Sequence, residues 1–309
     1  MNGASANGVS VQIQTVLYKM DHASIFRAFD SVANALRVNH EHPEAPQVGR
    51  ITIVHGDASP EPTFTPEQVE DIQRRYGDAF TYVYRYFNEN TGTSRGHNLM
   101  FEDCDSDYLV VQNPDIQYAP RFFERMLEPF SRTDRRVGLV EARQVPIQHP
   151  KTYDELTGET PWSTGACFMI ASSVYREIGG FDAGLFFMYC DDVDLSWRVR
   201  LAGYTIIFQP LAPVYHPKYL SNTGGWQSTD AEAYYSREAM LFMCYKWSYD
   251  KRLETLLRDF LASDDKISQK AAQSFIKRRD AGNLPAQLDP HHKVADINDN
   301  GYATLRFFM

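Results

Sequence analysis

Cysteine is scarce in this chain, and its placement excludes two common uses of the residue. Only four of the 309 residues are cysteines, at Cys104, Cys167, Cys190 and Cys244. They form no C-x-x-C pair, and no histidine stands at the spacing of a zinc site. We therefore expect four reduced thiols in a cytosolic protein, with neither a disulfide framework nor a structural zinc ion.

Long apolar runs are also absent. No stretch approaches the roughly 20 apolar residues that a membrane-spanning helix needs. The first ten residues, M-N-G-A-S-A-N-G-V-S, lack the basic and apolar regions of a signal peptide. These absences favour a cytoplasmic location, and they leave open peripheral contact with the inner face of the cell membrane.

Positive charge is in deficit. The chain has 31 Lys and Arg residues against 40 Asp and Glu residues, which gives a formal net charge of -9. A general nucleic-acid binder needs a basic face to neutralise phosphates, so no nucleic-acid partner is expected. A nucleotide ligand is still allowed, because one metal ion and one or two cationic side chains can hold a diphosphate.

Strand and helix patterns alternate through the first ~130 residues. Apolar or alternating strand patterns occupy residues 9–18, 50–54, 81–87 and 108–112, and helical spacing occupies 24–36, 67–76 and 92–104. This alternation predicts an open α/β sheet of mostly parallel strands, flanked by helices. In such sheets ligands bind beyond the carboxyl ends of the strands.

The second half of the chain adds further elements. Strand patterns occupy 137–145, 165–171 and 204–208, and helical patterns occupy 191–202, 229–262 and 267–279. We expect a disordered N-terminus at 1–8, one α/β domain at 9–228, a helical extension at 229–281 and a C-terminal arm at 282–309. We expect the aromatic residues of the extension to pack on the main domain, with membrane contact or homo-oligomer formation as the alternatives.

Polar residues with the chemistry of a site follow two of the strand patterns. Asn113-Pro114-Asp115 comes directly after residues 108–112, and a carboxylate there can bind a divalent cation, although the tripeptide is also good turn chemistry. His216 follows the strand pattern at 204–208, and a histidine there is either a metal ligand or a structural residue.

Three acidic residues gather where the helix at 191–202 begins. Asp191, Asp192 and Asp194 exceed what a helix cap needs, and the helix N-terminus favours their negative charge. A carboxylate held near a hydroxyl can act as a general base. The cluster is therefore interpreted either as part of a catalytic site or as an N-terminal helix cap with additional acidic residues.

The order of these motifs resembles glycosyltransferase family 2, which has the GT-A fold, and in particular its rhamnosyltransferase-like branch. The resemblance spans residues 9–217. It is carried by L-Y-K at 17–19, N-E-N-T-G-T-S-R-G-H-N at 88–98, Y-L-V-V-Q-N-P-D at 108–115, W-S-T-G-A-C-F-M-I at 162–170, G-G-F-D at 179–182, F-F-M-Y-C-D-D-V-D-L-S-W-R at 186–198 and V-Y-H at 214–216.

The resemblance implies a role for particular residues. Asp115 is similar to the retained carboxylate of the family's metal-binding motif, and His216 to the histidine that completes the metal site. Asp192 matches the catalytic base, and Asp191 would orient it or hold acceptor hydroxyls. The donor pocket would be formed by Tyr18, Asp57, Arg95, Asn113, Asp115, Trp162 and Gly165.

Three departures from the family pattern stand out. Lys19 replaces an Asn, Asp191 replaces a Glu, and H-G-D-A-S at 55–59 replaces D-N-x-S, which bears on Asp57 as a nucleobase ligand. A sugar nucleotidyltransferase is disfavoured because no Gly-rich basic loop follows the first strand.

The resemblance implies an inverting glycosyltransferase that uses Mg²⁺ or Mn²⁺ in polysaccharide biosynthesis. It would move rhamnose or a similar sugar from a dTDP- or UDP-sugar to a hydroxyl of a glycan or lipid-linked glycan. The alternative is a catalytically degenerate GT-A module that only binds nucleotide-sugars, and donor hydrolysis separates the two.

Overall fold

An eight-stranded mixed sheet forms the centre of the computed structural model, which describes residues 8–217, 229–298 and 301–302. The strand order is β3-β2-β1-β4-β7-β6-β8-β5. The strands are β1 (Val9–Leu17), β2 (Val48–Asp57), β3 (Thr81–Tyr86), β4 (Tyr108–Gln112), β5 (Gln117–Tyr118), β6 (Val137–Val145), β7 (Cys167–Ala171) and β8 (Thr205–Tyr215). Only β7 and β5 run antiparallel to their neighbours, which confirms the predicted open, mostly parallel sheet.

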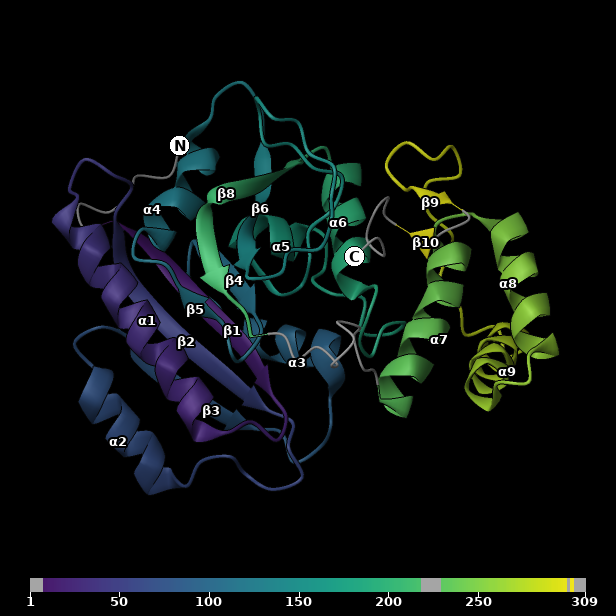
Figure 1. Cartoon of the computed structure of the whole chain (residues 1–309), viewed down its shortest axis with the longest axis horizontal. Helices are drawn as coiled ribbons and strands as arrows, with labels where there is room; N and C mark the ends of the chain where they lie inside the picture. The colour runs from purple at the N-terminus through teal and green to yellow at the C-terminus, as the bar shows by residue number, and fades with distance from the viewer. Residues whose placement is uncertain (1–7, 218–228, 299–300, 303–309) are drawn as a thin grey trace.

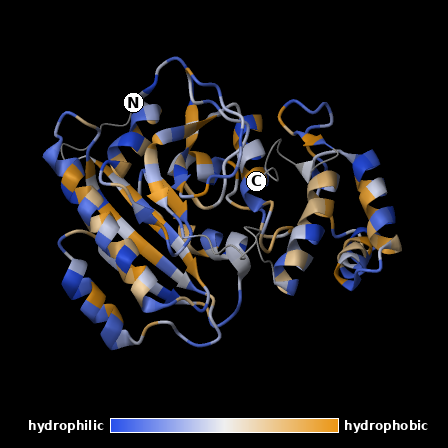
Figure 2. Cartoon of the chain, viewed as in Figure 1, coloured by the Kyte–Doolittle hydropathy of each residue, from blue (hydrophilic) through white to orange (hydrophobic). Residues whose placement is uncertain are grey.

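Helices cover both faces of this sheet (Figure 1). On one face α1 (His22–Glu41), α2 (Pro66–Tyr76) and α4 (Phe122–Leu127), followed by a short 3₁₀ turn at Glu128–Ser131, share a core with the strands. On the other face lie α3 (Gly92–Phe101), α5 (Ser172–Glu177) and α6 (Asp191–Leu201). Hydrophobic residues accordingly gather on the central strands and on the inner faces of the helices (Figure 2).

Local sequence signals fix several helix starts. Asp21 accepts a hydrogen bond from the Ser24 backbone at α1, and Thr65 and Gln68 form a reciprocal capping box at α2. A glycine sets how closely α3 approaches the sheet, because a Cβ at Gly96 would lie 2.7 Å from a Val16 methyl carbon. This close approach brings the start of α3 to the carboxyl end of β1.

Three C-terminal helices, α7 (Asp230–Lys246), α8 (Asp250–Ala262) and α9 (Lys266–Asp280), stand together beside α6 (Figure 1). Their buried faces form a second core with α6, in which the Trp197 and Trp247 rings meet edge to face at 5.2 Å. Aromatic residues of the extension thus pack against the main domain.

The structure differs from the sequence expectations in three places. The helical pattern at 229–262 is two helices, because the chain turns at Ser248 with a left-handed φ of 64°. β8 runs on through Pro210 to Tyr215, because a bulge opposite Ala142 and Arg143 absorbs residues 210–212. The expected arm at 282–309 contains two short strands that pair antiparallel, β9 (Ile297–Asn298) and β10 (Gly301–Tyr302).

Two further sequence expectations concern the ends of the chain and membranes. The predicted disordered N-terminus comprises residues 1–8. Residues 1–7 lie outside the described ranges, and Gly8 is the first residue described. Within the described ranges, no helix has both the length and the apolar character that a membrane crossing requires.

Candidate active site

The sheet topology brings the sequence-predicted site residues to one edge. β1, β2, β4, β6 and β8 all point their carboxyl ends there, and the antiparallel β7 begins there. Asn113 follows β4, His216 follows β8, and Gly165 precedes β7. Residues far apart in sequence therefore meet beyond the strand ends, as expected for a ligand site in an open α/β sheet.

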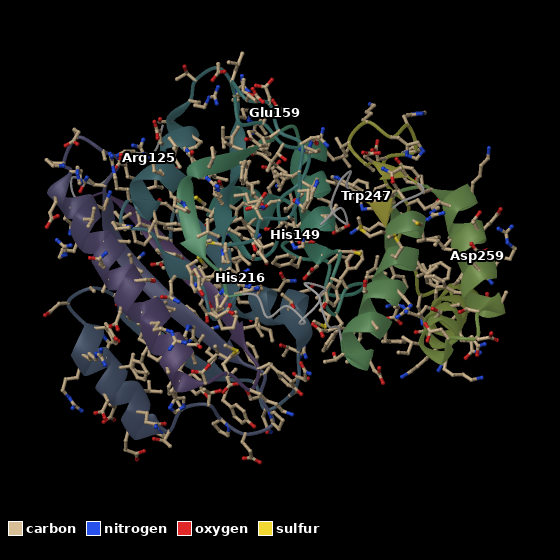
Figure 3. All side chains as sticks on the ribbon, in the orientation of Figure 1. Arg125, His149, Glu159, His216, Trp247 and Asp259 are labelled. Carbon is tan, nitrogen blue, oxygen red and sulfur yellow. The ribbon has the colours of Figure 1, made fainter. Side chains whose placement is uncertain are left out.

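Asp115 and His216 form a pair with the donor atoms of a cation site. Oδ1 of Asp115 lies 3.6 Å from Nε2 of His216, and the amide nitrogen of Asn113 lies 3.2 Å from the same Nε2. Figure 3 labels His216 just beyond the end of β8. Burial raises the pKa of Asp115, and the negative charge of Asp21 adds to the rise; a cation beside the carboxylate would oppose both.

The donor set fits a divalent cation. A carboxylate oxygen and an imidazole nitrogen are ordinary ligands of Mn²⁺, and Nδ1 of His216 is held by Oε1 of Gln144 at 2.8 Å, the usual support of a ligating histidine. Among the residues described, no third His, Cys, Asp or Glu side chain completes a metal-binding group. The remaining positions around a cation would belong to phosphate oxygens and water.

Asp192 is held by the segment that leads into β7. Oδ2 of Asp192 accepts a hydrogen bond from the Gly165 backbone at 2.9 Å, and Oδ1 accepts from the Val193 backbone at 2.8 Å. The next residue, Ala166, accepts from the Asn113 backbone at 2.9 Å. Two consecutive residues, Gly165 and Ala166, therefore connect the Asp192 carboxylate to the loop that carries Asp115.

Asp191 and Asp194 have different surroundings from Asp192. Asp191 is 7% exposed and accepts a hydrogen bond from the Ser94 hydroxyl at 3.1 Å, so α3 supports it. Asp194 is fully buried and contacts Arg198 at 2.8 Å and Lys246 at 2.7 Å. Burial alone would raise the pKa of Asp194, but the two cations lower it. Asp194 is thus a structural anchor.

A strained turn delivers the two catalytic candidates. Tyr189 and Cys190 both have left-handed backbones, with φ of 67° and 59°, and Cys190 makes no side-chain cap at α6. Such conformations in non-glycine residues cost of order 1–3 kcal/mol each and cluster at functional sites. The turn places Asp191 and Asp192 at the first positions of α6, where the helix N-terminus favours negative charge.

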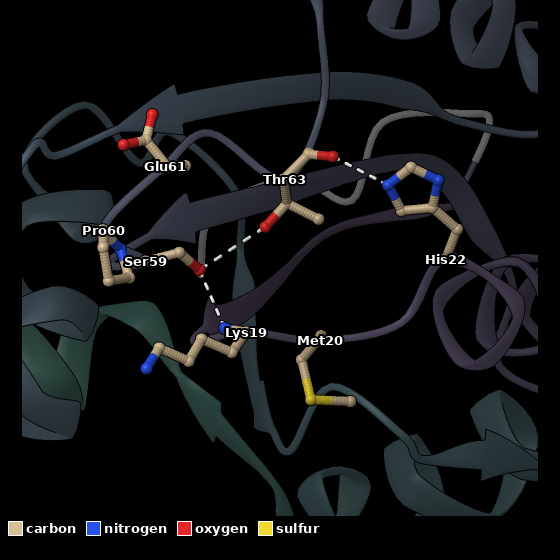
Figure 4. A pocket seen from close by; sticks show the side chains of 7 residues that line it. All are labelled: Lys19, Met20, His22, Ser59, Pro60, Glu61 and Thr63. Atoms are coloured by element: carbon tan, nitrogen blue, oxygen red, sulfur yellow. Dashed lines mark hydrogen bonds between the residues drawn. The ribbon is translucent and has the colours of Figure 1, made fainter.

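A small hollow lies beyond the ends of β1 and β2 (Figure 4). Its volume is about 280 Å³, and it is lined by Lys19, Met20, His22, Ser59, Pro60, Glu61 and Thr63. The Lys19 backbone donates to the Ser59 hydroxyl at 2.8 Å, which joins the two strand ends. Tyr18 beside it is 45% exposed, so its ring is accessible to a ligand.

Asp57 holds the loop at residues 59–63, which lines this hollow. The Asp57 side chain is fully buried and accepts hydrogen bonds from the backbones of Ser59 at 2.9 Å and Thr63 at 2.6 Å and from the Tyr84 hydroxyl. Burial by itself would raise the pKa of Asp57, but these hydrogen bonds lower it. Contact between Asp57 and a nucleobase stays a prediction.

Two other residues predicted to line the pocket of the sugar donor have protein partners in the structure. Arg95 is half-exposed on α3 and pairs with Glu89 at 2.7 Å. Trp162 is fully buried, with the Lys151 ammonium 4.5 Å from its ring centroid. The surrounding chain screens the Trp162 ring from solvent, so a part for Trp162 in the sugar pocket stays a prediction.

The sequence analysis missed a buried polar group next to His216. Glu141 and Lys151 form a buried ion pair, and Thr164 and Gln144 link Glu141 to His216. Burial raises the pKa of Glu141, while Lys151 and Thr164 act against the rise. A polar residue near the end of a strand, such as Gln144, was the one available signal.

The fold and the polar strand ends together define a GT-A type enzyme scaffold. Glycosyl transferase family 2 matches residues 27–193, more than half of the chain. The chain belongs to this family, and its relatives place it among rhamnosyltransferase-like members.

Two relatives and two solved structures illustrate this likeness. N-acetylglucosaminyl-diphospho-decaprenol L-rhamnosyltransferase of Mycobacterium tuberculosis (strain H37Rv) is 25% identical over 240 residues, 66% of this chain and 75% of the relative. Rhamnosyltransferase WbbL of Escherichia coli (strain K12) is 29% identical over 86 residues, 26% of this chain and 32% of the relative.

Among solved structures, GalNAc-T7 with UDP, GalNAc and Mn²⁺ has a TM-score of 0.61 at 14% identity. That match covers 91% of this chain and 60% of the GalNAc-T7 chain. The mannosyltransferase PcManGT of Pyrobaculum calidifontis with GDP-Man and Mn²⁺ has a TM-score of 0.58 at 14% identity, covering 89% of this chain and 76% of that one. At these identities the two structures share the fold.

Proposed function

We propose that this chain is an inverting, metal-dependent glycosyltransferase. It transfers rhamnose or a similar sugar from a nucleoside-diphosphate donor to a hydroxyl group. The mycobacterial relative is named for a diphospho-decaprenol-linked sugar. That name supports a lipid-linked glycan as the acceptor here.

One observation carries the proposal. The Asp192 carboxylate accepts from the Gly165 backbone, and the next residue, Ala166, accepts from the backbone of Asn113, two positions before Asp115. A base for the acceptor and a holder for the donor's phosphates therefore share one edge of the sheet. That is the arrangement that a single-displacement sugar transfer needs.

The proposed chemistry follows from this arrangement. Asp192 accepts the proton of the acceptor hydroxyl as that oxygen attacks the anomeric carbon from the face opposite the nucleotide. A new C–O bond forms while the bond to the diphosphate breaks, which inverts the configuration. Asp191, held by Ser94, orients Asp192 or an acceptor hydroxyl.

The donor would bind along the strand ends. Tyr18 and Lys19 stand at the hollow beyond β1, and Arg95 could exchange Glu89 for a phosphate oxygen. Asp115 and His216, with Asn113 beside them, would hold Mg²⁺ or Mn²⁺. The ion supplies positive charge that stabilises the departing nucleoside diphosphate.

A thermal-shift screen of nucleoside diphosphates and nucleotide-sugars, each with and without Mn²⁺, tests the proposal. A ligand at 100 times its Kd stabilises the fold by about 2.7 kcal/mol. We expect a metal-dependent shift with one nucleotide, and we expect Asp115→Ala to abolish it.

Sugar release separates an enzyme from a degenerate binding module. We expect metal-dependent hydrolysis of the same donor, since water can replace the acceptor. A folded protein that binds a nucleotide-sugar but never releases free sugar would support the binding module instead. Absence of any nucleotide-dependent shift would contradict both functions.

A further inference from the structure

A line of hydrogen bonds leads from a buried charge to His216. Glu141 pairs with Lys151, and Oε1 of Glu141 accepts from the Thr164 hydroxyl at 3.1 Å. The Thr164 hydroxyl accepts from Nε2 of Gln144 at 2.9 Å, and Oε1 of Gln144 lies 2.8 Å from Nδ1 of His216. The three relay residues Glu141, Thr164 and Gln144 are each at least 97% buried.

The relay has one direction of donation. A carboxylate only accepts, so the Thr164 hydroxyl gives its proton to Glu141 and must receive from Gln144 through its NH₂ group. The Gln144 amide then presents its oxygen to His216, and an oxygen can only accept. Nδ1 of His216 must therefore carry a proton, which leaves Nε2 of the neutral ring unprotonated.

The contact on the other side of the ring agrees with this assignment. The amide nitrogen of Asn113 lies 3.2 Å from Nε2 of His216, and an NH₂ group facing Nε2 needs a lone pair there. Nε2 is also the ring atom that lies nearest Asp115 in the pair, at 3.6 Å. The Gln144 and Asn113 contacts thus favour the same tautomer, and they outweigh the Asp115 carboxylate, which favours a proton on Nε2 but lies beyond hydrogen-bond distance.

The charge at the start of the relay is well anchored. The Lys151 side chain is 2% exposed, donates to the Trp162 carbonyl at 2.7 Å and lies over the Trp162 ring. A cation held there keeps Glu141 as an acceptor. The direction of the relay is consequently set by an ion pair that lies away from the cation site.

We infer that Thr164 and Gln144 are positioning residues that preset His216 in the tautomer whose Nε2 can bind a divalent cation. The inference rests on the proposed metal site. A neutral histidine in water favours the proton on Nε2, so the relay must reverse that preference. Because Thr164 precedes Gly165, the same residue also ties the cation pair to the segment that holds Asp192.

The tautomer of His216 can be read without metal or substrate. Long-range ¹H–¹⁵N spectra of the metal-free protein at about pH 8, above the ordinary histidine pKa near 6.5, distinguish a proton on Nδ1 from one on Nε2. We expect Nδ1–H in the wild type and a mixture with Nε2–H in Thr164→Val. Thr160→Val is the matched control, because Thr160 is equally buried but its hydroxyl bonds none of the three relay residues: it donates to the Thr152 carbonyl at 3.0 Å, with the Trp162 carbonyl at 3.4 Å.

Affinity for Mn²⁺ in the presence of UDP or dTDP provides the second readout. We expect Thr164→Val to weaken it by on the order of 10-fold, the scale of lost support behind a metal ligand, and Thr160→Val to leave it unchanged. Nε2–H in the wild type overturns the inference, and so does a Thr164→Val protein with unaltered tautomer or unaltered affinity. The wild-type spectrum decides the tautomer even if Thr164→Val fails to fold.

The proposed metal site can fail separately from the relay. If Asp115→Ala binds Mn²⁺ as tightly as the wild type does, the cation site lies elsewhere, whatever the spectrum shows. If Asp115→Ala loses Mn²⁺ while wild-type His216 carries Nε2–H, the metal site stands and the relay is wrong.

Discussion

Replacing Asp192 with Asn tests the base directly, because the side chain keeps its shape and loses its charge. We expect turnover to fall by about 100- to 10,000-fold, the range for loss of a general base. At 1.36 kcal/mol per factor of ten, this corresponds to roughly 3–5 kcal/mol in the activation free energy.

The same substitution has a calculable effect on stability. The carboxylate of Asp192 accepts one backbone hydrogen bond on each oxygen, from Gly165 and from Val193. An amide has one oxygen, so one of these buried N–H groups loses its acceptor, at a cost of about 1–3 kcal/mol. The melting temperature should therefore fall by several degrees.

Sugar transfer should be measured at 25 °C, well below that melting temperature, with donor binding followed in parallel. Asp191→Asn is the matched control, because the Ser94 hydroxyl, which donates to the Asp191 carboxylate, can donate to an amide oxygen as well. We expect a smaller loss of turnover there. Transfer near the wild-type rate by Asp192→Asn, from folded protein that binds donor, would refute the base assignment.

Two further predictions concern stability. In Lys246→Met the buried Asp194 loses one of its two cationic partners. Urea unfolding should therefore show a loss of about 3–5 kcal/mol in the free energy of unfolding. Lys251→Met, on the exposed face of α8, should change that free energy little. Burial lowers the pKa of His55 and of His97 to about 3, below the unfolded value near 6.5. The contribution of each neutral histidine to the free energy of unfolding is thus fully present above pH 6.5 and falls toward pH 3, by up to about 1.4 kcal/mol per unit. Unfolding at several pH values should show this loss, and between about pH 6 and pH 5, above the carboxylate range, His97→Leu should reduce the slope by the share of one histidine.

Periodicity in the sequence was enough to predict the sheet and the alternating helices, because strands and helices that bury one face leave a repeating apolar pattern. It was not enough at Pro210, where proline is tolerated because it lies in a bulge of β8, opposite Ala142 and Arg143 of β6. Nor did it find the break at Ser248, because the turn is set by how α7 and α8 pack on their neighbours.

The shared location of candidate site residues could be predicted where topology alone brings them together. Asp115 and His216 follow strands, so an open parallel sheet places them at one edge. The different surroundings of Asp192 and Asp194 could not be predicted, because they depend on partners such as Lys246, 52 positions from Asp194. Gln144 was missed for the same reason, since an isolated amide carries no spacing signal.

Asp194 also explains why the C-terminal helices matter to the site. α6 presents Asp192 to the sheet edge with its first turn, and the same turn buries Asp194 against Lys246 and Trp247 of the extension, both of which contact its Oδ1. Figure 3 labels Trp247 on the side of these helices that faces α6.

A common hydrophobic core crosses the expected boundary between residues 228 and 229, since Trp162 and Cys190 belong to the same cluster as Phe242 and Phe275. Cys190 also forms the strained turn before Asp191. Side chains from the extension are therefore packed around the turn that holds the proposed base in place. We accordingly propose that residues 229–281 fold as part of the catalytic unit, and that the boundary marks a change in secondary structure more than a division between independent domains.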